Sequence, residues 1–255
     1  MRLSLLLCLA LAACGTSYAV PPATDPGIEP AVLPGGASRG ARDFARVVAR
    51  VEPAAEAMCR EEAQRANCDY RIMLAADPDM PPNAFQTLDD NGRPIIVVTR
   101  SLLAEMRSDD EVAFVLSHEA SHHIAGHIGR QQQQQVLGAM VLGGLVTAAG
   151  QMSGTPASED AVRQAMDMGA YVGGRAYSQS YELEADTVGA YVTARGGYDP
   201  AAGAAVFGRP ALANPGGPAI LASHPASAQR QATVARVAAD IRAQQAAGRV
   251  PTPGR

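Results

Sequence analysis

Hydrophobic residues form short apolar runs between residues 70 and 99, and longer periodic segments lie on both sides of this region. Three of the short runs are rich in β-branched or aromatic residues and predict β-strands. They are Tyr70–Ala75, Asn83–Leu88 and Pro94–Thr99. The Asp-Asp-Asn-Gly sequence at residues 89–92 predicts a turn between the last two strands.

Helical patterns surround these strands. They predict helices over residues 43–62, from Ser108 onward, from Ser178 to the glycine pair at 196–197, from the Asp-Pro pair at 199–200, and over residues 226–246. Pro53 is expected to bend or break the first helix, because proline lacks a backbone donor. Ser108 and Glu111 form a capping box that starts the second helix. Together these elements predict an α+β fold, mainly helical with a small mixed β-sheet.

The segment after residue 130 is apolar, and its sequence is compatible with more than one environment. The glutamine run Gln131–Gln135 allows the preceding helix to continue, and the next run, Val136–Ala149, carries no charge. Fourteen uncharged residues are too few to span a bilayer, so we expect this run to be buried. The alternative is a hairpin that lies against a membrane or a substrate. Residues 150–156 predict a flexible loop, either a lid over a cleft or a site of self-cleavage.

Composition favours one main domain. The 255 residues are 47% hydrophobic but only 4% aromatic, so the core must consist mainly of Ala, Val, Leu and Met. The formal net charge is −4 and no basic cluster occurs, which argues against a nucleic-acid partner. We expect the domain at residues 41–248, after a Pro/Gly-rich tether at 14–40 and before a disordered tail at 249–255.

The amino terminus has the features of an export signal. Arg2 precedes the apolar run Leu3–Ala13, which is too short for a permanent membrane span. The run closes on Leu-Ala-Ala-Cys at residues 11–14, which resembles a bacterial lipobox. This sequence predicts a signal peptide at 1–13 and acylation of Cys14, so that lipid would anchor the mature protein to a membrane.

Two further features bear on the compartment. Gly15 stands where an Asp would retain a lipoprotein in the inner membrane, which favours the periplasmic face of the outer membrane of a Gram-negative bacterium. The alternative is cleavage after Ala19, which would leave a soluble periplasmic protein. In an oxidising compartment Cys59 and Cys68 are expected to form a disulfide that ties a helix end to the next strand.

The densest chemistry lies at residues 117–129, which hold four of the five histidines of the chain. The segment contains His-Glu-x-x-His, made of His118, Glu119 and His122. Two histidines four apart share one face of a helix and can bind one metal ion. Glu119 is close enough to take a proton from a water activated by that metal. The motif therefore suggests zinc-dependent attack of water on a carbonyl.

A pair of acidic residues further along the chain supplies a candidate third ligand. Glu182 and Asp186 are four residues apart on a predicted helix and share one face. One of these carboxylates can bind the metal while the other orients a ligand imidazole. Glu184 points elsewhere on this helix and is expected to be solvated. An ordinary charged helix face is the alternative for this pattern when it is taken without the upstream histidines.

The complete motif set excludes one class of zinc peptidase and resembles another. A metzincin would need a histidine six residues beyond His122, but position 128 is Ile. The pattern resembles the membrane-associated zinc metallopeptidases that include HtpX and BepA. The residues that carry the resemblance are His118, Glu119, His122, His127, Glu182, Ala185, Asp186 and Gly189, with Cys59, Cys68, residues 83–85, 94–99, 102–103 and 223–225 in the same order. The resemblance covers residues 41–245; it departs at Gln179, where many relatives have Arg.

The resemblance implies a zincin-type domain with its sheet beside the zinc helix, and a role for each motif residue. His118, His122 and Glu182 would bind one Zn²⁺, and Glu119 would act as general base and acid. Asp186 would orient a ligand from behind. His224 would either polarise the developing oxyanion or gate the metal, unless it is a surface histidine before a proline.

The remaining histidines and the sheet complete these expectations. His127 is expected to pack or form hydrogen bonds, and His123 is expected to be exposed. An edge strand beside the zinc helix would pair with an extended substrate, and we assign that edge to Asn83, Ala84 and Phe85.

The expected function is a zinc endopeptidase of the cell envelope that cleaves misfolded or unassembled proteins, as the resemblance implies. Two alternatives belong to other classes. One is an envelope chaperone or assembly factor that binds unfolded strands in the same cleft with little proteolysis. The other is a purely structural zinc site, in which His224 would supply a fourth and closing ligand.

Overall fold

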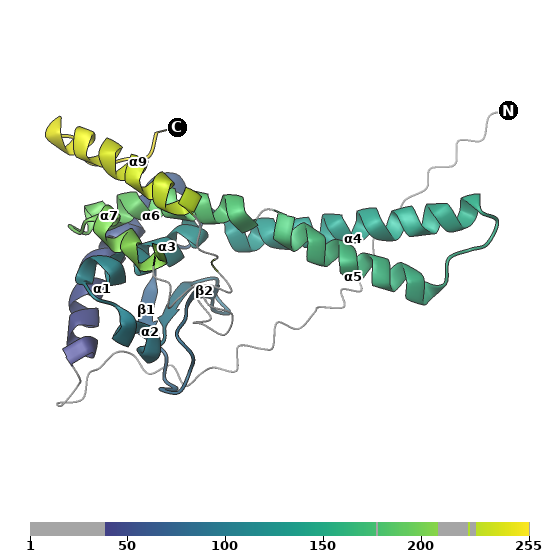
Figure 1. The fold of residues 1–255 in the computed structure, drawn as a ribbon, viewed down its shortest axis with the longest axis horizontal. Helices are drawn as coiled ribbons and strands as arrows, with labels where there is room; N and C mark the ends of the chain where they lie inside the picture. The colour runs from purple at the N-terminus through teal and green to yellow at the C-terminus, as the bar shows by residue number, and fades with distance from the viewer. Residues whose placement is uncertain (1–38, 177, 209–223, 225–227, 255) are drawn as a thin grey trace.

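The computed structural model describes residues 39–176, 178–208, 224 and 228–254. The helices are α1 (Arg39–Glu62), α2 (Arg100–Glu105), α3 (Asp109–Ile124), α4 (His127–Met152), α5 (Glu159–Ala176), α6 (Ser178–Arg195), α7 (Pro200–Gly203), a 3₁₀ turn η1 (Ala204–Gly208) and α9 (Ala228–Ala246). The strands are β1 (Arg71–Leu74), β2 (Ala84–Leu88) and β3 (Pro94–Val98). Figure 1 shows a globular body from which α4 and α5 project together as a long hairpin.

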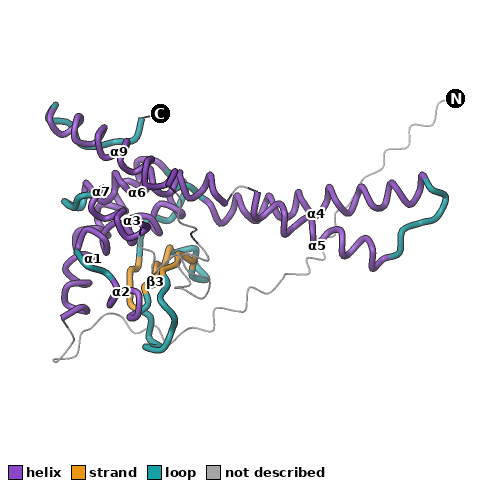
Figure 2. Tube along the Cα trace, viewed as in Figure 1, coloured by secondary structure: helices purple, strands orange, loops and turns teal. Residues whose placement is uncertain are grey.

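The three strands form one small mixed sheet, as the sequence predicts. Their order is β1-β3-β2, with β1 parallel and β2 antiparallel to β3. All five residues of β3 are buried, which fits a central strand of this apolar composition. The strands lie together on one side of the helical layer (Figure 2). Mainly helical structure with a small mixed sheet confirms the α+β fold class.

Helix α3 lies at the centre of the body. Every residue from Glu111 to Ala120 is buried, including the polar ones. Ser108 caps this helix by accepting a hydrogen bond from the Glu111 backbone N–H at 3.2 Å, as the predicted capping box requires. Helix α1 covers α3 with an apolar stripe at helical spacing, and it continues through Pro53 without a break. The stripe consists of Phe44, Val47, Val51, Ala55 and Met58.

The zinc-motif helix does not run on through the glutamines. It ends at Ala125, and Gly126 adopts a left-handed conformation with φ of +67° before α4 begins. The glutamine run allowed the helix to continue, but the helix is interrupted because Gly126 accepts a backbone conformation that residues with a Cβ avoid. As a result, α4 leaves α3 in a new direction.

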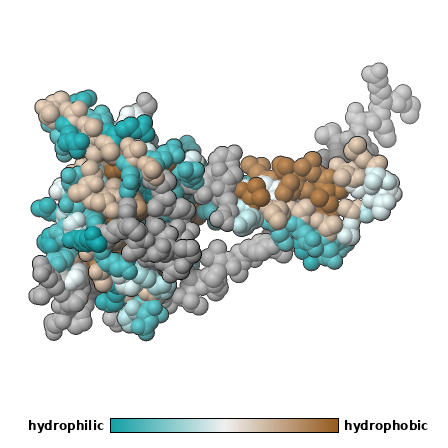
Figure 3. Space-filling view, in the orientation of Figure 1, coloured by the Kyte–Doolittle hydropathy of each residue, from teal (hydrophilic) through white to brown (hydrophobic). Residues whose placement is uncertain are grey.

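The uncharged run at 136–149 is largely exposed, so the expectation that it is buried was wrong. It forms the middle of α4, whose outer face carries large apolar side chains in contact with solvent. Their exposed fractions are 58% at Val136, 60% at Leu137, 63% at Met140, 59% at Val141 and 61% at Leu145. Figure 3 shows this apolar ridge along the projecting hairpin. Among the described elements, α5 alone covers α4 over most of its length, and one partner helix cannot bury the whole circumference of α4.

Helix α5 meets α4 through glycine. A Cβ added at Gly138 would come within 2.1 Å of the Gly169 carbonyl oxygen, so the two backbones touch at this point. Among the described helices, α4 is long and apolar enough to cross a bilayer by length and composition, although only 11% of its most apolar window is buried. In contrast, the beginning of α5 carries the exposed charges of Glu159, Asp160 and Arg163.

A disulfide near the start of the body and hydrogen bonds near its end hold the chain in place. Cys59 in α1 and Cys68 before β1 form the predicted disulfide, with their Cα atoms 5.7 Å apart. The segment after α9 was expected to be disordered at 249–255, but it packs on the body as far as the structure describes it. Arg195 donates to the Pro251 carbonyl oxygen at 2.7 Å, and the Thr252 backbone N–H donates to Gln244 at 2.9 Å.

The break between α3 and α4 predicts a specific response to substitution. Gly126→Ala should lower the free energy of unfolding by about 1–2 kcal/mol, because a Cβ disfavours positive φ. Gly126→Asn should lose less, because asparagine tolerates this conformation. Gly129→Ala, in open space inside α4, should instead gain about 0.5–1 kcal/mol. Urea denaturation in the presence of chelator measures all three; equal losses at the two positions would contradict this account of the break.

Candidate metal centre

The site forms where α3 and α6 pack side by side. Gly189 of α6 makes this approach possible, because a Cβ there would lie 3.1 Å from both the Cα and the backbone nitrogen of His118. The close contact places the carboxylates of Glu182 and Asp186 beside the imidazoles of α3. The structure therefore brings together the two motifs that are separated in the sequence by about sixty residues.

Four donor atoms converge at this point. The Nε2 atoms of His118 and His122 are 3.0 Å apart. Glu182 lies 3.3 Å from His118 Nε2 and 3.5 Å from His122 Nε2. His224 Nδ1 lies 3.0 Å from both carboxylate oxygens of Glu182 and 3.3 Å from His118 Nε2. One donor atom from each of these residues lies within 4.8 Å of the other three.

This spacing fits a tetrahedral zinc ion. Zinc binds imidazole nitrogen and carboxylate oxygen at about 2.0–2.1 Å, so the corners of its tetrahedron lie about 3.3 Å apart. The distances from His118 to the other three residues, and from Glu182 to His122 and His224, range from 3.0 to 3.5 Å, and the whole set lies within 4.8 Å. Three nitrogens and one carboxylate are also the donor types that zinc prefers. The residues present therefore fit this metal.

Asp186 holds the ring of His118 from behind, as the sequence predicts. Its Oδ1 lies 3.0 Å from His118 Nδ1, which leaves Nε2 of the same ring directed at the cluster. Arg230 of α9 donates to both oxygens of Asp186 at 2.7 Å and lies 2.9 Å from Glu182. Its guanidinium also covers the Phe207 ring at 4.0 Å. Sequence analysis missed Arg230, because nothing near it in the sequence marks it out from the other arginines of α9.

The charges of the cluster favour a cation. In the protein without bound metal, burial opposes protonation of His118, but hydrogen bonds to Asp186 and Glu182 raise its pKa to about 9. Burial also disfavours the charged form of Glu182, yet the hydrogen bonds to His118 and His224 hold its pKa well below the usual range. The pKa of His122 is lowered by burial and by the nearby charge of His118. The carboxylates are thus ionised and compensated by positive charge, which a divalent cation supplies.

Glu119 is buried beside the four donors, with 1% of its surface exposed. Its Oε1 accepts no hydrogen bond from any described residue, although His224 Nε2 lies 3.4 Å away. A buried carboxylate oxygen without a hydrogen-bond partner lowers the stability of the folded protein. Its position next to the cluster suits a group that exchanges a proton with a ligand of the metal.

A cleft of about 370 Å³ opens onto the cluster. Its walls include Phe85 and Gln86 of β2, with Glu119, His122, Tyr181 and Glu182 across from them. Among the described strands β2 pairs only with β3, so its outer edge has no strand partner. Of the predicted edge segment at 83–85, Phe85 lines this cleft beside the metal ligands, whereas Ala84 is buried in the core and Asn83 precedes the strand.

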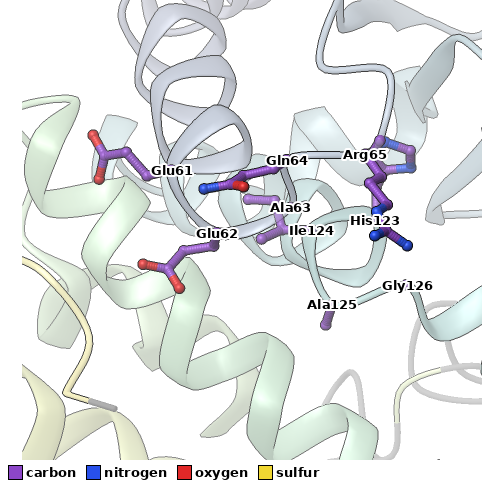
Figure 4. Close-up of a pocket in the computed structure, with 10 residues that line it drawn as sticks. Glu61, Glu62, Ala63, Gln64, Arg65, His123, Ile124, Ala125 and Gly126 are labelled. Atoms are coloured by element: carbon purple, nitrogen blue, oxygen red, sulfur yellow. The ribbon is translucent and has the colours of Figure 1, made fainter.

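The other two histidines of the motif do not belong to the set of four donors. His123 is half-buried, which differs from the expected exposure, and its Nε2 lies 2.8 Å from the Asn67 carbonyl oxygen. It lines a separate pocket at the end of α1, and the four donors are not among the residues that line this pocket (Figure 4). His127 is buried and forms hydrogen bonds, as predicted. Glu184 is exposed, as expected, and it also pairs with Arg130 at 2.6 Å.

Comparison with known proteins gives one match. The profile of Peptidase family M48 matches residues 42–238, which is most of the chain and includes every donor of the cluster. A search of curated proteins finds no match.

Arg230 should be essential for stability even without metal. Arg230→Ala should lower the free energy of unfolding by about 3–5 kcal/mol, because Asp186 would keep its buried charge and lose its partner. Arg242→Ala, at an exposed position on the same helix, should change it by less than about 0.5 kcal/mol. Urea denaturation in chelator measures both. A loss of less than 1 kcal/mol for Arg230→Ala would contradict the role assigned to this ion pair.

Proposed function

The chain belongs to peptidase family M48, and we propose that within this family it is a zinc-dependent endopeptidase of the bacterial cell envelope. The observation that carries the catalytic part is the set of four donor atoms within 4.8 Å of one another, with the buried carboxylate of Glu119 beside them. Membership of the family accounts for the metallopeptidase chemistry.

His118, His122 and Glu182 would hold the zinc ion. When bound, zinc lowers the pKa of a water molecule and polarises the carbonyl of the scissile bond. Glu119 accepts the proton of the attacking water on its unpartnered oxygen and then donates that proton to the leaving amine. Asp186 keeps His118 in the tautomer whose Nε2 faces the metal.

His224 governs access to the site in this proposal. Its Nδ1 lies 3.0 Å from Glu182 and 3.3 Å from His118 Nε2, so it would compete with an attacking water for a place on the bound metal. His224 therefore closes the resting site and moves aside when a substrate enters. Its other nitrogen, near Glu119, then becomes available to stabilise negative charge on the carbonyl oxygen.

The cleft favours extended polypeptide as substrate. The free edge of β2 offers backbone donors and acceptors to a strand laid beside it, and Phe85 lies in the wall next to the metal ligands. We assign Asn83, Ala84 and Phe85 to this substrate edge. Only an unfolded or unassembled chain presents its backbone in this way, which supports a role in removing such proteins.

Membrane association and export rest on other parts of the chain. Cys14 falls outside the described residues, and its acylation remains a proposal from the lipobox. The disulfide between Cys59 and Cys68 supports an oxidising compartment. The apolar ridge of α4 would suit a membrane surface, and the charges at the beginning of α5 favour lying along the bilayer over crossing it.

An envelope chaperone that uses the same cleft is the second hypothesis, and Glu119→Gln separates the two. This variant should keep bound zinc but lose casein hydrolysis by about 10²–10⁴-fold, because the amide cannot accept the proton. Zinc content is measured on the same purified sample. If Glu119→Gln still restores envelope integrity to cells that lack the protein, binding alone suffices and the proteolytic proposal is wrong.

His224→Ala tests the proposed gate. The variant should retain zinc through its three remaining ligands, and casein hydrolysis should rise by about 10-fold if one molecule in ten is open at rest. Metal analysis and initial rates on casein measure both effects. Loss of zinc would indicate a structural four-ligand site, and a fall in rate with zinc retained would leave His224 only the role at the oxyanion.

A further inference from the structure

We propose that His127 and Glu184 are positioning residues, which together fix the tautomer and orientation of the zinc ligand His122. This inference rests on the proposed zinc site, and it assigns to a second imidazole and a surface carboxylate the work that Asp186 performs for His118. The two groups lie on different helices, α4 and α6. His127 contacts the ligand His122 directly, and Glu184 contacts His127.

The hydrogen bonds run in one direction from the metal ligand outward. His122 Nδ1 lies 2.8 Å from His127 Nδ1, and His127 Nε2 lies 3.2 Å from Glu184 Oε2. Arg130 holds the same carboxylate oxygen at 2.6 Å. The three contacts thus form an unbroken chain from the cluster to the surface.

Only one arrangement of protons satisfies this chain when metal is bound. His122 Nε2 faces the cluster and must present a lone pair, so the proton of a neutral ring is on Nδ1. His122 Nδ1 therefore donates, and His127 Nδ1 must accept. The proton of His127 is then on Nε2, where the Glu184 carboxylate accepts it. Each donor meets an acceptor, and the carboxylate ends the chain.

The ring of His127 is fixed by its surroundings. It is 4% exposed and stacks on Tyr181, with ring centroids 4.4 Å apart and planes inclined by 18°. The Arg130 guanidinium lies 4.8 Å from the centroid of the Tyr181 ring. This packing prevents free rotation of His127, so the ring can act as an oriented acceptor for His122.

The break at Gly126 explains how a spacing of five residues gives this contact. In a continuous helix, residues five apart lie about 140° apart around the axis and do not meet. The left-handed conformation of Gly126 turns the chain before His127, which brings the two rings to a centroid distance of 4.9 Å. Helical spacing alone therefore does not predict the contact between His122 and His127.

The expected effect is on zinc affinity before activity. Groups that orient a metal-binding imidazole typically change metal affinity by 10–100-fold when they are removed. His127→Phe keeps an aromatic ring against Tyr181 but removes both nitrogens, so it should raise the zinc dissociation constant by about 10–100-fold. Glu184→Ala should raise it by about 10-fold, and Glu184→Gln by less, because an amide oxygen still accepts from His127.

The experiment is a competition between each full-length variant and a chromophoric zinc chelator at one pH. His123→Phe is the matched control, because His123 is adjacent to His122 and lies outside the donor cluster. The Co²⁺-substituted proteins give a second readout, since a reoriented imidazole changes the visible absorption of the metal. Thermal unfolding of the metal-free proteins shows that each variant folds, and Glu184, with 44% of its side chain exposed, tolerates substitution most easily.

The outcomes separate this inference from the zinc site itself. Glu182→Ala should abolish tight zinc binding; if it does not, or if the wild type takes up no zinc, the proposed metal centre is wrong. If the wild type binds zinc and both His127→Phe and Glu184→Ala bind it as tightly as His123→Phe does, the positioning role is wrong. Weaker binding in both variants, with partial recovery in Glu184→Gln, supports it.

Discussion

The architecture depends on the burial of several ionisable groups at one point between α3, α6 and α9. Charged groups are buried at acceptable cost only when they are paired and hydrogen-bonded. Arg230 meets this condition for Asp186 and Glu182, and the imidazoles of α3 complete the set. Because the partners come from three helices, the pairing requires all three helices to be in place.

This requirement explains residues that would otherwise look unrelated. Gly189 lets α6 approach the backbone of His118, and α3 is buried around its whole circumference because it supplies both core and ligands. The last helix, α9, joins the site through Arg230, although it carries none of the four donors. A catalytic cluster held this way loses its geometry whenever the body unfolds, so stability and metal affinity are coupled.

The sequence predicted the parts of the site that follow from helical spacing. His118 and His122, and likewise Glu182 and Asp186, are four residues apart, and each pair shares a face in the structure. It could not predict Arg230, because a tertiary ion pair has no local pattern. The burial expected for residues 136–149 was wrong for a different reason. An apolar run shows a preference to leave water, but it does not show whether a neighbouring element is available to cover it.

The backbone turn at Gly126, which brings His127 to His122, also connects the metal centre to the exposed hairpin of α4 and α5. His127 and Arg130 occupy the first turn of α4, and the apolar ridge begins less than two turns later. The first turn of α4 therefore joins the exposed hairpin to the metal centre through two side chains, His127 beside His122 and Arg130 paired with Glu184.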